Sequence, residues 1–233
     1  MARVTMREAG TVAAGGRVLP LTLRCDPRAR RLTLRLVDDG VRVTVPSARH
    51  ARAARALAEA RAGWIAEQLA ERPVPVALGV GTVLRVHGTP RRIVRAARPG
   101  AAARLLPGRI VTGGADEAAT ARRIEALLRR EAVAWFETES ARLGARLGLP
   151  PCPVSVRRMR SRWGSCGGGA LRYDWRLILA PPGVAPYVAA HEVAHRTHPD
   201  HSPAFWAQVA ALMPDWQAPH DWLKRTGHHL HAY

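Results

Sequence analysis

Two histidines and a glutamate form the short segment His191-Glu192-Val193-Ala194-His195. On a helix, residues four apart lie on the same face, so the imidazoles of His191 and His195 can point at one metal ion. Glu192 lies on the flank of that face, where its carboxylate can reach a water on the metal without being a ligand. The spacing therefore predicts a metal-dependent hydrolase with Glu192 as its catalytic base.

The third protein ligand must lie further along the chain. Glu192 is the last glutamate of the sequence, so a downstream glutamate ligand is excluded. Pro199 disfavours helical geometry at the residue before it, which ends the helix and lets the chain turn back toward the metal. We therefore predict a zinc site with the ligands His191, His195 and His201. The alternatives that remain for the third ligand are His198, Asp200, Asp215 and Asp221, of which Asp200 has the character of a turn residue.

The length and composition are those of a globular protein. The chain has 233 residues, of which 47% are hydrophobic, enough for one sizeable core or two small domains. No stretch approaches the about 18 apolar residues of a membrane span, and charged residues interrupt the N-terminal segment, so we expect no export signal. The three cysteines are far apart and include no Cys-x-x-Cys pair, which favours a reducing compartment. We expect a cytoplasmic protein.

The positive charge is unevenly distributed along the sequence. Residues 1–115 hold 21 Arg against 7 acidic residues, a net charge of +14, whereas residues 116–233 hold 14 Arg and one Lys against 11, a net charge of +4. Such a field attracts phosphate backbones with little sequence selectivity, so non-specific nucleic acid is a candidate partner of the N-terminal region. The alternative is compositional bias, which explains Arg in place of Lys but not the shortage of acidic residues.

Residues 1–115 predict a basic, β-rich region with one helix. Alternating apolar and polar residues predict strands at 17–24, 31–37 and 41–45, the last two joined by a turn at Asp38-Asp39-Gly40. A helix is expected from Ser47 to about Glu71, ended by Pro73. A second strand pair is expected at 81–86 and 91–95, with His87 in its turn, and 99–114 is expected to be irregular or weakly stranded.

Residues 116–233 predict helices packed on a short sheet, which makes the expected fold class α+β. A long helix from Asp116 to about Leu147 carries apolar residues at helical spacing and stops at Gly148 and Pro150. Short strands are expected at 154–156 and 171–179. The metal helix is expected to begin near residue 186, and further helices are expected at 204–213, after Ser202 as N-cap and Pro203, and at 219–226. The sequence thus predicts two domains, 1–115 and 116–233.

Several motifs resemble one known family. They are Ser161-Arg162-Trp163-Gly164-Ser165-Cys166, Trp175-Arg176-Leu177-Ile178-Leu179-Ala180-Pro181, Tyr187 to His195, His201-Ser202-Pro203-Ala204-Phe205-Trp206, and Met213-Pro214-Asp215. In this order they resemble the YgjP-like zinc metallopeptidases, relatives of the SprT and WLM groups. The resemblance implies a small zincin-type fold with zinc held by His191, His195 and His201. One departure is Asp174, where the family usually has Asn. This difference can alter a hydrogen bond that supports the site residues, or a substrate contact.

Three function classes follow. The first is a zinc metallopeptidase of the HExxH type, with 171–179 as the strand whose edge docks an extended peptide, and with Tyr173, Arg162 or Arg176 as candidates to stabilise the oxyanion. The second is hydrolysis of a nucleotide phosphoanhydride at the same metal site. The third is a nucleic-acid-associated protein with a structural metal, which an open coordination position disfavours because structural zinc usually has four protein ligands.

Overall fold

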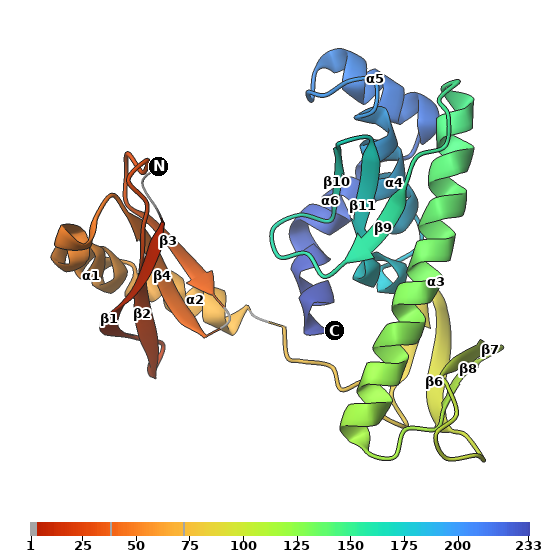
Figure 1. The fold of residues 1–233 in the computed structure, drawn as a ribbon, viewed down its shortest axis with the longest axis horizontal. Coiled ribbons are helices and arrows are strands. Elements are labelled where there is room, and N and C mark those ends of the chain that lie inside the picture. Colours follow the sequence, from red (N-terminus) through yellow and green to blue (C-terminus); the bar gives the residue numbers. More distant parts are fainter. Residues whose placement is uncertain (1–3, 38, 72) are drawn as a thin grey trace. The chain divides into compact units, whose positions relative to one another are not determined.

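The chain divides into two compact units with separate hydrophobic cores. The computed structural model describes residues 4–37, 39–71 and 73–233, and the units are Met1–Arg72 and Pro73–Tyr233 (Figure 1). Both mix helices and sheets, so the expected α+β class is confirmed. The division falls at residue 72, however, and not at residue 115 as expected from the sequence. Among the described residues, no helix has both the length and the apolar character of a membrane span.

The N-terminal unit is a four-stranded sheet packed against two helices. The strand order is β1-β2-β4-β3, with β2 and β4 parallel and the outer pairs antiparallel. Its elements are β1 (Thr5–Ala14), β2 (Arg17–Cys25), β3 (Thr33–Val37), β4 (Gly40–Val45), a 3₁₀ turn η1 (Ala48–His50), α1 (Ala51–Ala60) and α2 (Ala62–Ala70). The three predicted strands are confirmed and β1 is added to them. Asp38, in the predicted turn, lies outside the described residues.

The helix predicted from Ser47 to Glu71 is confirmed in its bounds, but it is not a single helix. Arg61 leaves the helical backbone conformation, with φ −105° and ψ 13°, and separates α1 from α2. Ala54 and Ala58 of α1 and Ile65 of α2 are all buried in one core with the sheet. Because a sheet is twisted, a change of direction at Arg61 lets both helices stay in contact with it.

The C-terminal unit holds two sheets and the long helix α3. One sheet has the order β5-β6-β8-β7 and the other β10-β11-β9. Its elements are β5 (Val83–Val86), β6 (Thr89–Arg95), β7 (Arg104–Leu106), β8 (Arg109–Thr112), α3 (Glu117–Arg146), β9 (Val154–Arg157), β10 (Gly164–Gly167), β11 (Ala170–Asp174), the 3₁₀ helix η2 (Trp175–Leu179), α4 (Val184–Ala194), α5 (Pro203–Leu212), α6 (Gln217–Thr226) and the 3₁₀ helix η3 (Gly227–Ala232). The predicted helix α3 is confirmed, with the Asp116 carboxylate accepting a hydrogen bond from the Ala119 N–H at 2.7 Å.

The strand predicted at 171–179 is confirmed as far as Asp174, but its length and its predicted place at the edge of the sheet are wrong. It ends at Asp174, whose carboxylate accepts the N–H of Arg176 at 2.9 Å and so starts the buried helix η2. The remaining strand, β11, lies between β10 and β9 and has hydrogen-bonded neighbours on both sides. β11 therefore offers no edge to a peptide. The edge strand beside α4 is β10, in a segment that we had expected to be a connection.

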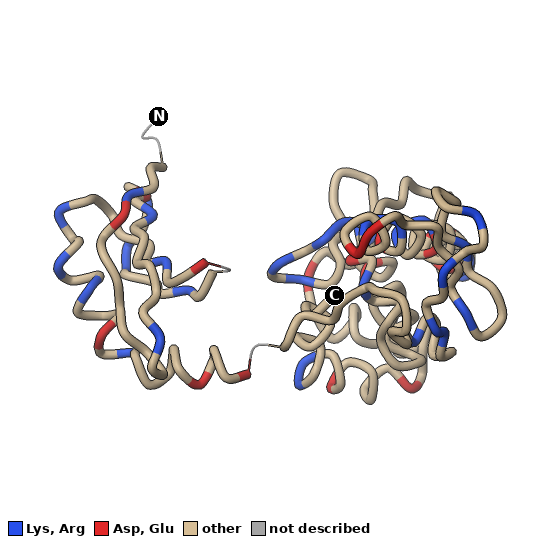
Figure 2. The backbone as a smooth tube through the Cα atoms, turned by 90° about the horizontal axis from the view of Figure 1, so that it is seen from below, with Lys and Arg blue, Asp and Glu red and all other residues tan. Residues whose placement is uncertain are grey.

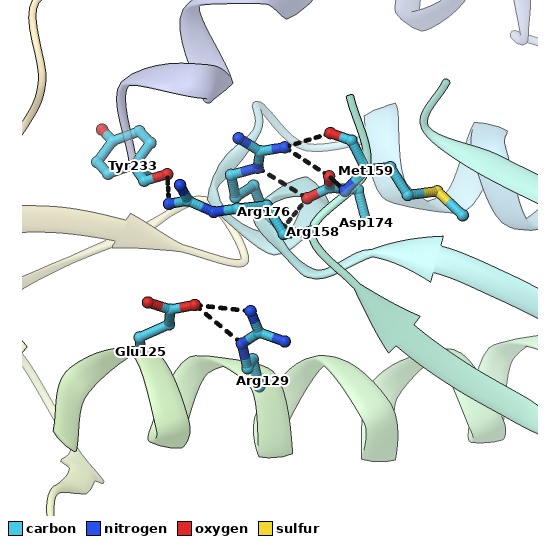
Figure 3. Close-up of polar contacts among 7 residues, drawn as sticks. All are labelled: Glu125, Arg129, Arg158, Met159, Asp174, Arg176 and Tyr233. Atoms are coloured by element: carbon cyan, nitrogen blue, oxygen red, sulfur yellow. Dashed lines mark hydrogen bonds and ion pairs between the residues drawn. The ribbon is translucent and has the colours of Figure 1, made fainter. Parts of the chain in front are cut away.

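Asp174 and Arg176 form a buried ion pair that holds the loop before β10 (Figure 3). Their side chains meet at 2.6 Å and are almost inaccessible to solvent. The Asp174 carboxylate also accepts the N–H of Met159 at 2.7 Å, and Arg176 donates to the carbonyl of Met159 at 2.8 Å. Both backbone groups of Met159 are thus bound, which fixes the segment that leads through Arg162 and Trp163 into β10. Asp174 has a structural role here.

Candidate metal centre

The structure brings His191, His195 and His201 together. His191 lies on α4, His195 caps its C-terminal end, and His201 immediately precedes Ser202, which is the N-cap of α5. The Nε2 atoms of His191 and His201 are 3.2 Å apart, and one nitrogen from each of the three rings lies within 4.8 Å of the others. Within the described parts of the chain, this group contains neither His198 nor an aspartate.

Neighbouring groups orient the imidazoles. His195 Nδ1 lies 3.0 Å from the carbonyl oxygen of His198, to which it donates in the tautomer that leaves Nε2 free. The hydroxyl of Tyr187 lies 3.4 Å from His191 Nδ1, and the ring of Phe205 stacks on His195 at 4.4 Å. Such partners of the second ring nitrogen fix which nitrogen faces a metal. The backbone of His198, and not its side chain, therefore serves the site.

The three side chains fit a divalent transition metal. The pKa of His191 is lowered to about 3, mainly by burial and then by the neighbouring His195, His201 and His220. The imidazole is therefore neutral at ordinary pH, which is the form that binds a metal. Three nitrogen ligands with a fourth position left for water are a donor set typical of catalytic zinc.

Glu192 is a buried carboxyl group beside the three histidines. Its exposed fraction is 6%, and burial raises its pKa to about 7 against the opposing effects of the Cys166 N–H, which donates to it, and of the Arg162 charge. A carboxyl with a pKa near neutrality can both accept and return a proton at physiological pH. The position and the ionisation of Glu192 therefore suit a general base.

Strand β10 is closely fitted to Glu192. A Cβ atom on Gly164 would lie 2.6 Å from both Cγ and Oε1 of Glu192, which no real side chain tolerates. The neighbouring Cys166 uses its backbone N–H to bind the same carboxyl group. The segment Trp163-Gly164-Ser165-Cys166 is thus fitted to Glu192: Gly164 leaves room for its side chain, and the Cys166 N–H binds its carboxyl group.

The family match agrees with this geometry. The profile described as YgjP-like, metallopeptidase domain, matches residues 30–226. The chain belongs to the YgjP-like metallopeptidase family. A divalent metal and a peptidase active site are what this family implies.

Comparisons with solved structures and with curated proteins give weaker similarity or none. A crystal structure of the metallopeptidase zymogen of Pyrococcus abyssi abylysin is similar at 20% identity, with a TM-score of 0.35; the match covers 40% of this chain and 95% of that one. No curated protein matches the chain.

A cavity of about 450 Å³ lies over the metal centre of this YgjP-like chain. Its walls come from β10 and the residues before it, from α4 and the adjoining His195, from Pro199 and His201, and from Leu223 of α6. Of the three oxyanion candidates, Arg162 lines this cavity. Tyr173 is instead buried, stacked on Phe136 at 4.1 Å and hydrogen-bonded to the hydroxyl of Ser140 at 3.0 Å, and Arg176 is bound to Asp174.

Sequence reasoning missed three contributions to the site. They are the space at Gly164, the backbone donor of Cys166 and the hydroxyl of Tyr187. Tyr187 had a readable signal, since it precedes His191 by four residues and so lies one helical turn away on the same face. The other two depend on β10 crossing α4, a tertiary contact that no local pattern predicts.

The net charge is divided differently when it is counted over the two structural units than when it is counted over residues 1–115 and 116–233. Residues 1–72 hold 14 Arg against 7 acidic residues, a net charge of +7, and residues 73–233 hold 22 Lys and Arg against 11, a net charge of +11. Residues 73–115, with seven Arg and no acidic residue, belong to the C-terminal unit. Lys and Arg positions accordingly occur along both units (Figure 2).

Proposed function

We propose that this family member is a zinc-dependent peptidase with Glu192 as general base. The observation that carries the proposal is the convergence of three imidazole nitrogens beside a buried carboxyl group whose pKa is close to 7. The zinc ligands would be His191, His195 and His201. When bound, zinc supplies a Lewis acid that acidifies water and polarises the scissile carbonyl.

The protein's own groups have separate tasks in this reaction. Glu192 accepts a proton from the attacking water and delivers it to the leaving amine nitrogen. The Cys166 N–H and the space at Gly164 hold its carboxyl group in place. Arg162, on the cavity wall, supplies positive charge toward the oxygen of the scissile carbonyl. An extended peptide pairs with the outer edge of β10, in place of the central strand β11.

A comparison of wild type with Glu192→Gln tests this function. Both proteins are purified without a His tag, loaded with zinc and assayed on casein. We expect kcat to fall by about 10²–10⁴-fold in the variant. The zinc content should be unchanged, because Glu192 is not a ligand. Loss of zinc from the variant, or activity equal to that of wild type, would contradict the assigned role.

A second candidate is hydrolysis of a nucleotide phosphoanhydride at the same metal site. It is favoured by Arg162 on the wall of the cavity and by the basic side chains beside it. Nucleoside triphosphates are therefore assayed in parallel with casein. The reaction class is the one whose activity Glu192→Gln abolishes, and a structural metal in a nucleic-acid-associated protein is the remaining interpretation if it abolishes neither.

Two further parts of the proposal concern partner and compartment. The net positive charge of both units supports non-specific affinity for nucleic acid, which should weaken steeply as salt rises. The cysteines Cys25, Cys152 and Cys166 are all free, which supports a reducing compartment, and we propose the cytoplasm.

A further inference from the structure

A second cavity adjoins the one over the metal centre. Its volume is about 410 Å³, and it shares the lining residues Arg162, Trp163, Tyr187 and Leu223 with the first. The other residues that line it are Arg160, Ser161, His220, Lys224, His228 and His231. Three lining side chains are permanently cationic and none is acidic. The second cavity is therefore an electropositive extension of the active site.

Hydrogen bonds and ring contacts fix the segment from Arg160 to Trp163, which forms one wall of the second cavity. The Asp174–Arg176 pair binds both backbone groups of Met159, directly before the basic segment (Figure 3). The Trp163 ring contacts the Arg176 guanidinium at 5.8 Å and stacks on the ring of His231 at 4.8 Å. The segment from Arg160 to Trp163 therefore begins next to a residue whose backbone is held by hydrogen bonds, and η3 packs on Trp163 through His231.

Two cationic side chains of the second cavity, Lys224 and Arg162, are exposed to solvent. The nearest acidic group along α6 is Asp221, which pairs with His220 at 2.9 Å and does not line the cavity. The Arg162 charge acts on Glu192, where it opposes the rise in pKa that burial causes, but no described carboxylate forms an ion pair with either cation. Positive charge without an ion-pair partner beside an active site favours an anionic ligand.

We infer that the second cavity binds a carboxylate of the substrate, so that the enzyme selects peptides with an acidic group close to the hydrolysed bond. The inference rests on the proposed peptidase function. The carboxylate has two sources, an Asp or Glu side chain or the C-terminus of the peptide. Both present the same planar anion to Arg and Lys donors.

Paired peptides test the inference with the zinc-loaded full chain. One set of fluorescence-quenched peptides has blocked ends and carries Glu or Gln at each position around the cleaved bond. A second set is neutral and ends in a free carboxylate or an amide. We expect kcat/KM to be about tenfold higher for the carboxylate member at one fixed position, the size of a charged hydrogen bond. The set that shows the preference identifies the source.

Neighbouring cations of α6 provide a matched comparison. Lys224→Gln should lower the ratio of kcat/KM between acidic and neutral peptides about threefold, as expected for an exposed charge, and Lys224→Glu should lower it about tenfold. Arg225→Gln removes the same charge from the next residue, which lines neither cavity, and should leave the ratio unchanged. Fluorescence anisotropy measures binding of the acidic peptide to the Glu192→Gln protein, which does not turn it over. When the Lys224 and Arg225 substitutions are added to this protein, the peptide affinity should fall in the same order.

These experiments distinguish a failure of the proposed carboxylate site from a failure of the proposed peptidase function. Cleavage of peptides without charge preference, or equal effects of Lys224→Gln and Arg225→Gln, overturns the carboxylate site and leaves the peptidase intact. No cleavage of any peptide by zinc-loaded wild type overturns the proposed function itself. Hydrolysis of nucleoside triphosphates that Lys224→Gln slows overturns both, and assigns the second cavity to a phosphate.

Discussion

The two four-stranded sheets of this chain have the same topology. Each consists of two antiparallel hairpins whose inner strands pair in parallel, in the orders β1-β2-β4-β3 and β5-β6-β8-β7. Their packing differs. In the first sheet Leu21 and Val43 are buried with α1 and α2, whereas in the second Ile93 and Ile110 are buried in one core with Ile124 of α3.

This difference shows that side-chain packing, and not strand order, assigns a sheet to its unit. The first sheet closes a core of its own, and no predicted metal ligand lies there. The second sheet shares its core with α4, which carries the predicted metal ligand His191. We therefore expect damage in the second sheet to reach the active site and damage in the first sheet to stay local.

The largest expected effect is at the buried ion pair. Asp174→Ala leaves the Arg176 charge buried without a carboxylate, which should cost about 3–5 kcal/mol of stability. Hydrogen exchange should show the loss in residues 73–233 and not in 4–71. Arg129→Gln is the control. It removes the Glu125–Arg129 ion pair on α3 (Figure 3), whose atoms are 2.7 Å apart and whose side chains are partly exposed, and it should change stability by less than about 0.5 kcal/mol.

Paired truncations test the two sheets directly. Ile110→Ala and Leu21→Ala each remove a side chain with no exposed surface, and each should cost about 3 kcal/mol. Ile110→Ala should lower hydrogen-exchange protection in α3 and α4. Leu21→Ala should lower it only within residues 4–71, and a loss in α4 from this variant would break the comparison.

A smaller effect is expected at the contact of β10 with Glu192. Gly164→Ala must displace the carboxyl group, and a misplacement of about 1 Å should lower kcat/KM about 100-fold. The zinc content and the N-terminal unit should not change. Gly167→Ala, on the same strand but with open space around its Cβ, serves as control and should retain wild-type activity.

The smallest effect is expected from one hydroxyl group. Tyr187→Phe keeps the ring but removes the partner of His191 Nδ1, which should weaken zinc binding about tenfold. Competition with a fluorescent chelator measures the affinity. Tyr173→Phe is the matched control. The Tyr173 hydroxyl binds Ser140 and none of the predicted metal ligands, so the zinc affinity of this variant should equal that of wild type.

The sequence predicted the parts of the structure that depend on short-range spacing. The four-residue interval between His191 and His195, and the interruption at Pro199, were enough to expect that His201 returns to them. Asp116 and Ser202 were readable as helix starts, because capping depends on residues within one turn. These features need no knowledge of the rest of the fold.

The parts that could not be predicted depend on tertiary contacts. β10 has a Gly-Ser-Cys-Gly sequence without alternation, so only its pairing with β11 makes it a strand. The strand β11 ends at Asp174 because of a hydrogen bond to Arg176. The sequence places the domain boundary at residue 115, where the basic, strand-rich part gives way to a long helix. Only the packing of the second sheet on α3 shows that this sheet belongs to the C-terminal unit.

We propose that three imidazoles of the C-terminal unit hold one zinc ion. The decisive measurement is the metal content of the untagged protein by inductively coupled plasma mass spectrometry. We expect one zinc per chain in wild type and in His198→Ala, since His198 contributes its backbone carbonyl, and none in His201→Ala. Full zinc content in His201→Ala, or its loss in His198→Ala, would contradict the account.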